Sequence, residues 1–260
     1  MECECRILSR SGGRTTNEDA GGFWSGETSC CAVLSDGAGG HGGGDIASKV
    51  IVRTCLESVR SQPEFGAGTI DSALRAANRA ITSEQERQPR FSDMRGTVVV
   101  LLIDQSRDVA WWGHYGDTRL YLFRHRRLVT RTKDHSVAQV MVDAGYLPAE
   151  KLRESPDRVK LTGALGDRDR YEPIIVDAEQ QVFDGDIFLL CTDGLWGLVD
   201  EAFMEQTLLH ALDPEDWLAA LQAEAVARGA DAGDNYSAMA LWCRDPDQAT
   251  RVSMPAAPHT

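Results

Sequence analysis

The chain has 260 residues, of which 42% are apolar, and its formal net charge is −13 at pH 7. This composition supports a sizeable core, and the excess of negative charge excludes nucleic acid and anionic membranes as main partners. The seven cysteines include no C-x-x-C pair, which favours a reducing compartment. Because neither a secretory leader nor a run of about 18 apolar residues is evident, we expect a cytoplasmic protein.

The first half of the chain predicts a buried strand followed by two helices. The apolar run CCAVL at 30–34 is typical of a buried strand, and a glycine-rich stretch, SDGAGGHGGGDIAS, follows it at 35–48. Two amphipathic helices come next, because apolar residues recur at helical spacing on one face of each. These residues are Ala47, Ile51, Cys55 and Val59 in the first helix and Ala73, Leu74, Ala77 and Ile81 in the second.

The second half predicts mainly strands. Four strand-like runs, at 97–103, 108–115, 118–124 and 127–132, have connections too short for parallel crossovers and predict an antiparallel meander. A helix at 136–146 precedes an irregular stretch at 147–170, whose length is typical of a functional loop. A strand at 186–191, two helices and a closing strand at 237–243 follow, and Asp213 and Pro214 open the second helix. We expect one domain over 1–243 and a disordered tail over 244–260.

The glycine-rich stretch has three possible interpretations. Gly37, Gly39 and Gly42 fit the dinucleotide pattern G-x-G-x-x-G, with Glu57 about 20 residues downstream. That interpretation fails because Glu57 falls within a predicted helix and the downstream strands are antiparallel. A structural turn is the second interpretation. The third is a binding site for a small charged ligand, since glycine lets the backbone approach a ligand closely.

Other aspartates in similar settings favour the ligand site. Asp36 and Asp193 each follow a buried strand and precede glycine, Asp234 leads into the closing strand, and Asp117 lies between two strands. Carboxylates that converge at strand ends repel one another unless cations lie between them. The pattern therefore predicts a metal site.

The residue types indicate which metal and which substrate. Carboxylate and carbonyl oxygens favour Mg²⁺ or Mn²⁺ over Zn²⁺, and the carbonyl of Gly37 is the preferred backbone ligand. Two such ions can activate a water for in-line attack on phosphorus. Arg14, just before the acidic run Asn17-Glu18-Asp19, could grip phosphate oxygens with its guanidinium group, or lie at the surface as an ordinary solvated arginine.

Eight motifs in order give the chain a family resemblance from about Ile7 to Trp242. They are RTTNEDA, VLSDGAGGHGGGDIAS, RGTVVVLLI, GHYGDTRLYLFR, KDHSVAQVMVDAG, ALGDRDRYEP, DIFLLCTDGLWGLVD and GDNYSAMAL. The chain resembles bacterial members of the metal-dependent protein phosphatases of the 2C type. The resemblance implies an α+β fold, a four-layer α-β-β-α sandwich in which two central antiparallel sheets are flanked by helix pairs.

The resemblance also implies an activity and roles for individual residues. The activity is hydrolysis of phosphoserine and phosphothreonine in proteins with two Mn²⁺ or Mg²⁺ ions, and a third in some members. Asp36 would bridge both ions, with Gly37 giving its carbonyl. Asp193 and Asp234 would hold the second ion, Asp19 would act through a coordinated water, Asp117 would contribute to the third site, and Arg14 would bind the phosphate. The segment 134–170 would form a mobile flap that shapes substrate access.

Some features depart from the family pattern or leave a role open. The usual GTT is Gly96-Thr97-Val98, the usual GDSR is GDTR, and Gly163 stands where relatives often carry arginine. None of these changes removes a metal ligand. His41 could be the general acid for the leaving oxygen or could only shape the pocket. We expect His114 and His135 to be packing or flap-base residues.

Two other functions compete with that of an active protein phosphatase. One is a phosphatase-like regulator that binds phosphoproteins without cleaving them, although such a protein would normally have lost a metal ligand. The other is a metal-dependent phosphodiesterase acting on a nucleotide or another small phosphoester. For the phosphatase, phosphorylated proteins are the expected partners, together with an opposing serine/threonine kinase.

Overall fold

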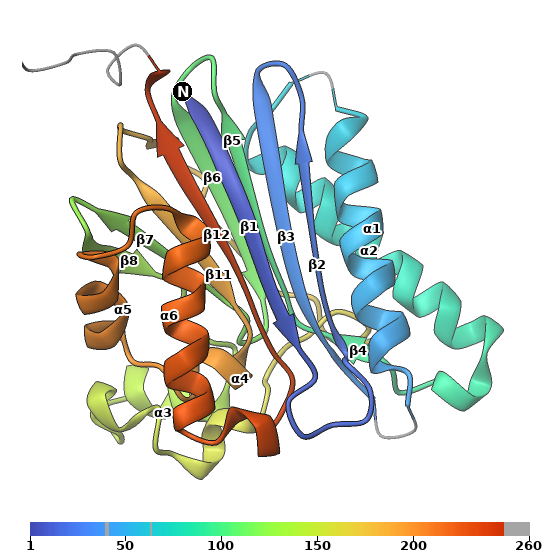
Figure 1. Cartoon of the computed structure of the whole chain (residues 1–260). Coiled ribbons are helices and arrows are strands. Elements are labelled where there is room, and N and C mark those ends of the chain that lie inside the picture. The colour runs from blue at the N-terminus through green and yellow to red at the C-terminus, as the bar shows by residue number, and fades with distance from the viewer. Residues whose placement is uncertain (40–41, 63, 247–260) are drawn as a thin grey trace, which may run out of the picture.

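Two antiparallel β-sheets lie face to face in the computed structural model (Figure 1), which describes residues 1–39, 42–62 and 64–246. The first sheet has the strand order β1 (Glu2–Arg10), β12 (Tyr236–Arg244), β11 (Ile187–Cys191), β7 (Arg119–Arg124) and β8 (Arg127–Arg131). The second has the order β10 (Gln180–Gln181), β6 (Val109–Tyr115), β5 (Val98–Asp104), β3 (Ser29–Ala38) and β2 (Asp19–Ser25). Two short strands complete the second sheet, β4 (Arg95–Gly96) beside β3 and β9 (Ile174–Ile175) beside β6.

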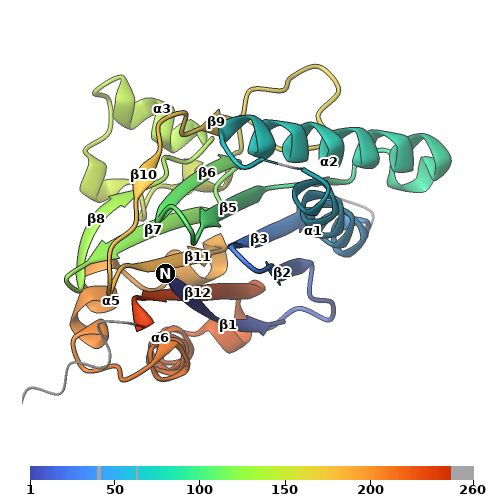
Figure 2. The ribbon, with the colours of Figure 1, turned by 90° about the horizontal axis from the view of Figure 1, so that it is seen from above.

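Helices cover the outer face of each sheet (Figure 2). Helices α1 (Gly44–Arg60) and α2 (Ala67–Arg87) pack on the second sheet, and α5 (Glu201–Leu208) and α6 (Pro214–Ala227) pack on the first. Helix α6 begins as the sequence predicts, with the Asp213 side chain accepting a hydrogen bond from the backbone N–H of Asp216 and Pro214 in the first turn. The predicted four-layer α-β-β-α sandwich is confirmed.

The position of strand β3 explains why its sequence is apolar without interruption. Side chains alternate between the two faces of a strand. Cys30, Ala32 and Leu34 point into the core between the sheets, whereas Cys31 and Val33 point toward α1 and α2. Because both faces are buried, β3 lacks the apolar-polar alternation of a strand with one wet face.

The predicted helices are present, and their predicted apolar residues are buried. In α1 these are Ala47, Ile51, Cys55 and Val59, and in α2 they are Ala73, Leu74, Ala77 and Ile81. The predicted helix at 136–146 is shorter: α3 (Val137–Asp143) begins after Ser136, whose side chain accepts a hydrogen bond from the backbone N–H of Gln139.

The predicted single meander is wrong in its connectivity. Strands β5 and β6 pair in one sheet, whereas β7 and β8 pair in the other. The chain changes sheets between Tyr115 and Arg119, where Gly116 has a φ of +114°. This left-handed conformation suits glycine and places Asp117 where the two sheets meet.

Two strands at the start of the chain were not predicted, and β3 extends further than expected. Strands β1 and β2 precede β3, and β3 continues to Ala38, so Asp36 and Gly37 lie within a strand and not in a loop. The remaining loop is short because α1 begins at Gly44. His41 lies outside the described residues.

The segment 134–170 contains α3 and two 3₁₀ turns, Ala149–Lys151 and Pro156–Val159. In Figure 1 it lies at the end of the sandwich that also carries α4 (Asp193–Trp196). Within the described residues, no helix is long and apolar enough to cross a membrane. Most of the expected disordered tail, from 247 onward, lies outside the described residues, and the domain and flap boundaries stay predictions.

Candidate metal centre

The end of β3 supplies the centre of the site. Asp36 lies opposite Asp19, the first residue of β2, so strand pairing sets two acids side by side. The next residue, Gly37, has no room for a side chain, because a Cβ atom there would lie 1.9 Å from the carbonyl oxygen of Gly44. Glycine is therefore required where β3 passes the start of α1.

The other predicted acids come from the connections around the two sheets. Asp117 follows β6, Asp193 begins α4 directly after β11, and Asp234 precedes β12. All three line one cavity of about 340 Å³ together with Asp36 and Gly37.

Arg14 and Glu18 also line this cavity, and Asp19 lies opposite Asp36 in the strand register. The Oδ2 atom of Asp19 accepts a hydrogen bond of 3.0 Å from the Thr192 hydroxyl. The fold thus brings the predicted site residues together, apart from His41, which lies outside the described residues.

The acids raise one another's pKa values. Burial raises the pKa of Asp36 well above its ordinary value, and the charges of Asp19 and Asp193 raise it further. Burial and the charge of Asp193 also raise the pKa of Asp117. The pKa of Asp19 is raised to about 7, mainly by burial, and its Oδ1 atom is buried without a hydrogen-bond partner. Burial and mutual repulsion therefore oppose ionisation of these acids.

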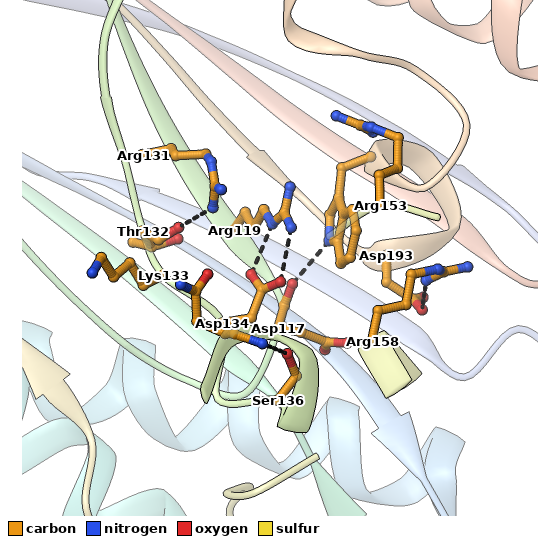
Figure 3. A network of polar contacts seen from close by, with 12 residues as sticks. Asp117, Arg119, Arg131, Thr132, Lys133, Asp134, Ser136, Arg153, Arg158 and Asp193 are labelled. Carbon is orange, nitrogen blue, oxygen red and sulfur yellow. Dashed lines mark hydrogen bonds and ion pairs between the residues drawn. The ribbon is translucent and has the colours of Figure 1, made fainter. Parts of the chain in front are cut away.

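Two arginines pair with acids of the cavity. Arg14 Nη2 lies 2.9 Å from Asp234 Oδ2, and both side chains are more than half exposed. Arg158 Nη1 lies 3.2 Å from Asp193 Oδ2 (Figure 3). Arg158 belongs to the Pro156–Val159 turn, and Val159 and Leu161 line the same cavity. Residues around the Pro156–Val159 turn therefore form one wall of the site.

The donor set fits hard divalent cations. Across the described part of the chain, no three His, Cys, Asp or Glu side chains are already arranged as ligands of one ion. Instead, Asp193 and Asp234 face arginines. The available donors around the cavity are carboxylate and backbone oxygens, which Mg²⁺ and Mn²⁺ prefer. The orphaned Asp19 Oδ1 and the mutual repulsion of the acids are the features that a divalent cation would compensate.

A buried arginine, which the sequence analysis did not single out, supports the site (Figure 3). The guanidinium of Arg119 donates to both carboxylate oxygens of Asp134 at 2.8 Å and lies 3.4 Å from the ring centroid of Trp196. The indole N–H of Trp196 in turn donates to the backbone carbonyl of Asp117 at 2.9 Å. Trp196 and Asp193 both belong to α4. The contacts of Trp196 with Arg119 and with the Asp117 carbonyl therefore fix Asp117 and Asp193 relative to each other.

Asn235 was also missed, although it directly follows Asp234. Its amide donates to the backbone carbonyls of Ser11 and Thr16, and its Oδ1 accepts from the backbone N–H of Glu18. These contacts hold the loop that carries Arg14. The GDN motif was visible in the sequence, but nothing local shows that its amide reaches a segment more than 200 residues away.

The histidines near the site have packing contacts. His114 is buried, bonds to the Lys133 carbonyl through Nε2 at 2.6 Å, and has its pKa lowered to about 4 by burial. His135 bridges Gly116 and the Glu172 carbonyl. These contacts agree with the packing role expected for both. Glycine at position 163, where relatives often carry arginine, is explained by steric crowding. A Cβ atom there would lie 2.2 Å from the ring of Tyr115.

A larger cavity, of about 570 Å³, lies elsewhere, between the start of α2 and the segment around Tyr171. It contains Asp71 and Arg75, which pair with each other at 2.7 Å. It shares no lining residue with the acidic cavity.

Comparison with solved structures agrees with the fold. A structure of the Mycobacterium tuberculosis serine/threonine phosphatase PstP/Ppp has a TM-score of 0.81 and 27% identity, over 94% of this chain and 99% of that chain. A structure of the PstP catalytic domain in complex with two manganese ions gives a TM-score of 0.80 over the same shares. The fold is therefore that of bacterial serine/threonine phosphatases.

Sequence comparison gives the family. The family profile "Protein phosphatase 2C" matches residues 9–225. The Listeria monocytogenes (EGD-e) serine/threonine phosphatase stp is 32% identical over 75% of this chain and 78% of its own length. M. tuberculosis (H37Rv) PstP is 32% identical over 69% of this chain, a match that spans only 34% of PstP. The chain belongs to the protein phosphatase 2C family.

Proposed function

We propose that the chain is a metal-dependent phosphatase that hydrolyses phosphoserine and phosphothreonine in proteins. The observation that carries the proposal is the single cavity in which Asp36, Asp117, Asp193 and Asp234 meet beside the backbone of Gly37. Family membership and the two manganese ions of the PstP structure support it.

Different residues would hold each of two Mn²⁺ or Mg²⁺ ions. Asp36 would bridge both ions and Gly37 would contribute its carbonyl. Asp193 and Asp234 would hold the second ion, Asp117 would contribute to a third site, and Asp19 would act through a water. When bound, such ions supply Lewis acidity and lower the pKa of a coordinated water, which becomes the attacking group.

Arg14 would bind the phosphate of the substrate. Its guanidinium group stands at the cavity, more than half exposed, and pairs with Asp234 at 2.9 Å. Since Asp234 would turn to a metal ion, the guanidinium would be free to bind two phosphate oxygens, a geometry that suits arginine. Arg119 and Trp196 would keep Asp117 and Asp193 in place during the reaction.

The partners and cellular location follow from the same proposal. The substrates would be phosphorylated proteins, and a serine/threonine kinase would oppose the enzyme. The wall formed by 156–161 would contact the substrate protein as part of a flap. The free cysteines of the described residues are compatible with the cytoplasmic location that we propose.

The test is hydrolysis of a phosphothreonine peptide, measured as phosphate release with Mn²⁺ and again with EDTA. We expect turnover only with the metal. Asp36→Asn is expected to abolish it, whereas Asp177→Asn, at an aspartate outside the site, keeps it.

Two results would overturn the proposal. Tight peptide binding without phosphate release would indicate a regulator that only recognises phosphoproteins. Faster hydrolysis of a cyclic nucleotide than of the peptide, followed by chromatography of the nucleoside monophosphate because no free phosphate forms, would indicate a phosphodiesterase.

A further inference from the structure

A cluster of thiols lies at the end of the sandwich opposite the metal centre. Cys3 on β1 and Cys243 on β12 are directly opposite in the strand register, and their sulfur atoms are 3.2 Å apart. Cys30, on β3 in the facing sheet, belongs to the same core cluster as Cys243, and Cys3 packs against this cluster. These three cysteines are therefore in one contact group.

The backbone places the Cys3–Cys243 pair at the closest type of cross-strand position. The Cys243 N–H donates to the Asp186 carbonyl, and the Cys243 carbonyl accepts from the Gly185 N–H, both at 2.9 Å. Because both groups point away from β1, Cys3 and Cys243 form a non-hydrogen-bonded pair, with Cα atoms about 4.5 Å apart. That spacing lies within the range of disulfides, about 4.4–6.8 Å.

The two thiols differ in access and in acidity. Cys3 is partly exposed and Cys243 is fully buried, so an oxidant in solution reaches Cys3 first. The hydrogen bond with Cys243 lowers the pKa of Cys3, whereas the pKa of Cys243 is raised. A partly exposed, acidic thiol beside a second thiol is the usual arrangement of a redox-sensitive cysteine.

We propose that Cys3 and Cys243 form a reversible disulfide in response to hydrogen peroxide. The Cys3 thiolate attacks peroxide, an S–O bond forms as the O–O bond breaks, and the hydroxide released takes up a proton to become water. Cys3 is then a sulfenic acid, oxidised by two electrons. The sulfur of Cys243 attacks that of Cys3, the S–S bond forms as the S–O bond breaks, and the leaving hydroxide takes the proton of Cys243.

The bond would fix the edge of the first sheet. In the strand order of that sheet, β1 has a neighbour only on the β12 side, so a link to β12 prevents it from detaching. The link also joins the first strand to the last and encloses nearly the whole described chain, which constrains the unfolded state strongly. Cys3 lies seven residues from Arg10 along β1, about 23 Å at strand spacing, so the modification acts on stability and leaves the metal centre intact.

Cys5 provides a matched control on the same strand. It lies two residues from Cys3, on the same face, and is also partly exposed. Its partner across the strands is Leu241 and not a cysteine, and burial raises its pKa to about 12. Cys5 therefore tests whether the position of Cys3, and not exposure alone, selects the reactive thiol.

The experiment treats the purified, reduced chain with one equivalent of hydrogen peroxide and maps the products by mass spectrometry after tryptic digestion. We expect two thiols to be lost and the peptides 1–6 and 229–244 to become linked through Cys3 and Cys243. The melting temperature should rise by about 5 °C or more and return to its first value with dithiothreitol. Cys3→Ser and Cys243→Ser should each abolish both effects, whereas Cys5→Ser and Cys30→Ser should retain them.

Three results would overturn the proposal. One is oxidation of Cys3 to sulfinic acid with no cross-link. Another is a cross-link that uses Cys5 or Cys30. The third is a disulfide between two chains, seen as a dimer on a non-reducing gel.

Discussion

Replacing Asp19 with asparagine tests whether the clustered acids oppose folding when no metal is bound. Asp19 is 6% exposed, and its pKa is raised from 3.8 to about 7. A raised carboxyl pKa means that the folded state holds the proton more tightly than the unfolded state. The resulting stability is present below the unfolded pKa and is lost as the pH rises toward the folded pKa.

The size of the effect follows from the shift. About three pKa units correspond to about 4 kcal/mol of unfolding free energy at pH 8. The Asp19→Asn variant would avoid this loss because an asparagine side chain carries no charge. In the variant, the asparagine side chain would place a buried polar group where Oδ1 of Asp19 has no hydrogen-bond partner. Leaving that group unpaired lowers the unfolding free energy by about 1–3 kcal/mol at every pH. The net gain at pH 8 is about 2 kcal/mol, or roughly 4–8 °C in melting temperature.

The assay is thermal unfolding of wild type and Asp19→Asn in EDTA between pH 4 and pH 8. We expect the difference in melting temperature to move in favour of the variant as the pH rises, mostly between pH 4 and 7. Asp177→Asn, at a position outside the site, should show no such trend. A difference that stays constant across this range would refute the reasoning, because an uncharged structural role for Asp19 would give that result.

Three further predictions address the metal centre and its supports. Adding Mn²⁺ should raise the melting temperature more at pH 8 than at pH 5, because burial and mutual repulsion oppose ionisation of Asp36 and Asp117; equal shifts would contradict this. Arg119→Met should lower the unfolding free energy by about 3–5 kcal/mol in urea titration, since it leaves the buried Asp134 unpaired; a loss below about 1 kcal/mol would argue against a structural role. Arg158→Ala should speed hydrogen exchange across 156–161, because its pair with the mostly buried Asp193 joins this segment to α4; unchanged exchange would show that the pair does not hold this wall.

The sequence pattern alone was sufficient to predict those elements whose buried residues recur at a regular spacing. Helices α1 and α2 each present one apolar face, and the buried positions are those that recur at helical spacing. The predicted aspartates also meet in one cavity, because strand ends and their glycines mark the rim of the sheets. The family resemblance supplied the layer order, which periodicity alone left open.

Other features depend on contacts that leave no local signal. Strand β1 was missed because it is an edge strand whose side chains are mostly half-exposed, so it shows no clear apolar alternation. The change of sheet at Gly116 was missed because β6 and β7 each read as ordinary strands in sequence. The pairs Arg158–Asp193 and Cys3–Cys243 join residues 35 and 240 positions apart, and only the folded structure shows them.

Calorimetric titration of the metal-free chain with Mn²⁺ tests the central claim most directly. We expect about two ions per chain for wild type and for Asp177→Asn, and a loss of binding for Asp36→Asn, which removes the proposed bridging carboxylate. Circular dichroism of Asp36→Asn should show an intact fold, so that lost binding reports on the site. The absence of Mn²⁺ binding to the folded wild-type chain, or unchanged binding to Asp36→Asn, would contradict the claim that these acids form a divalent metal centre.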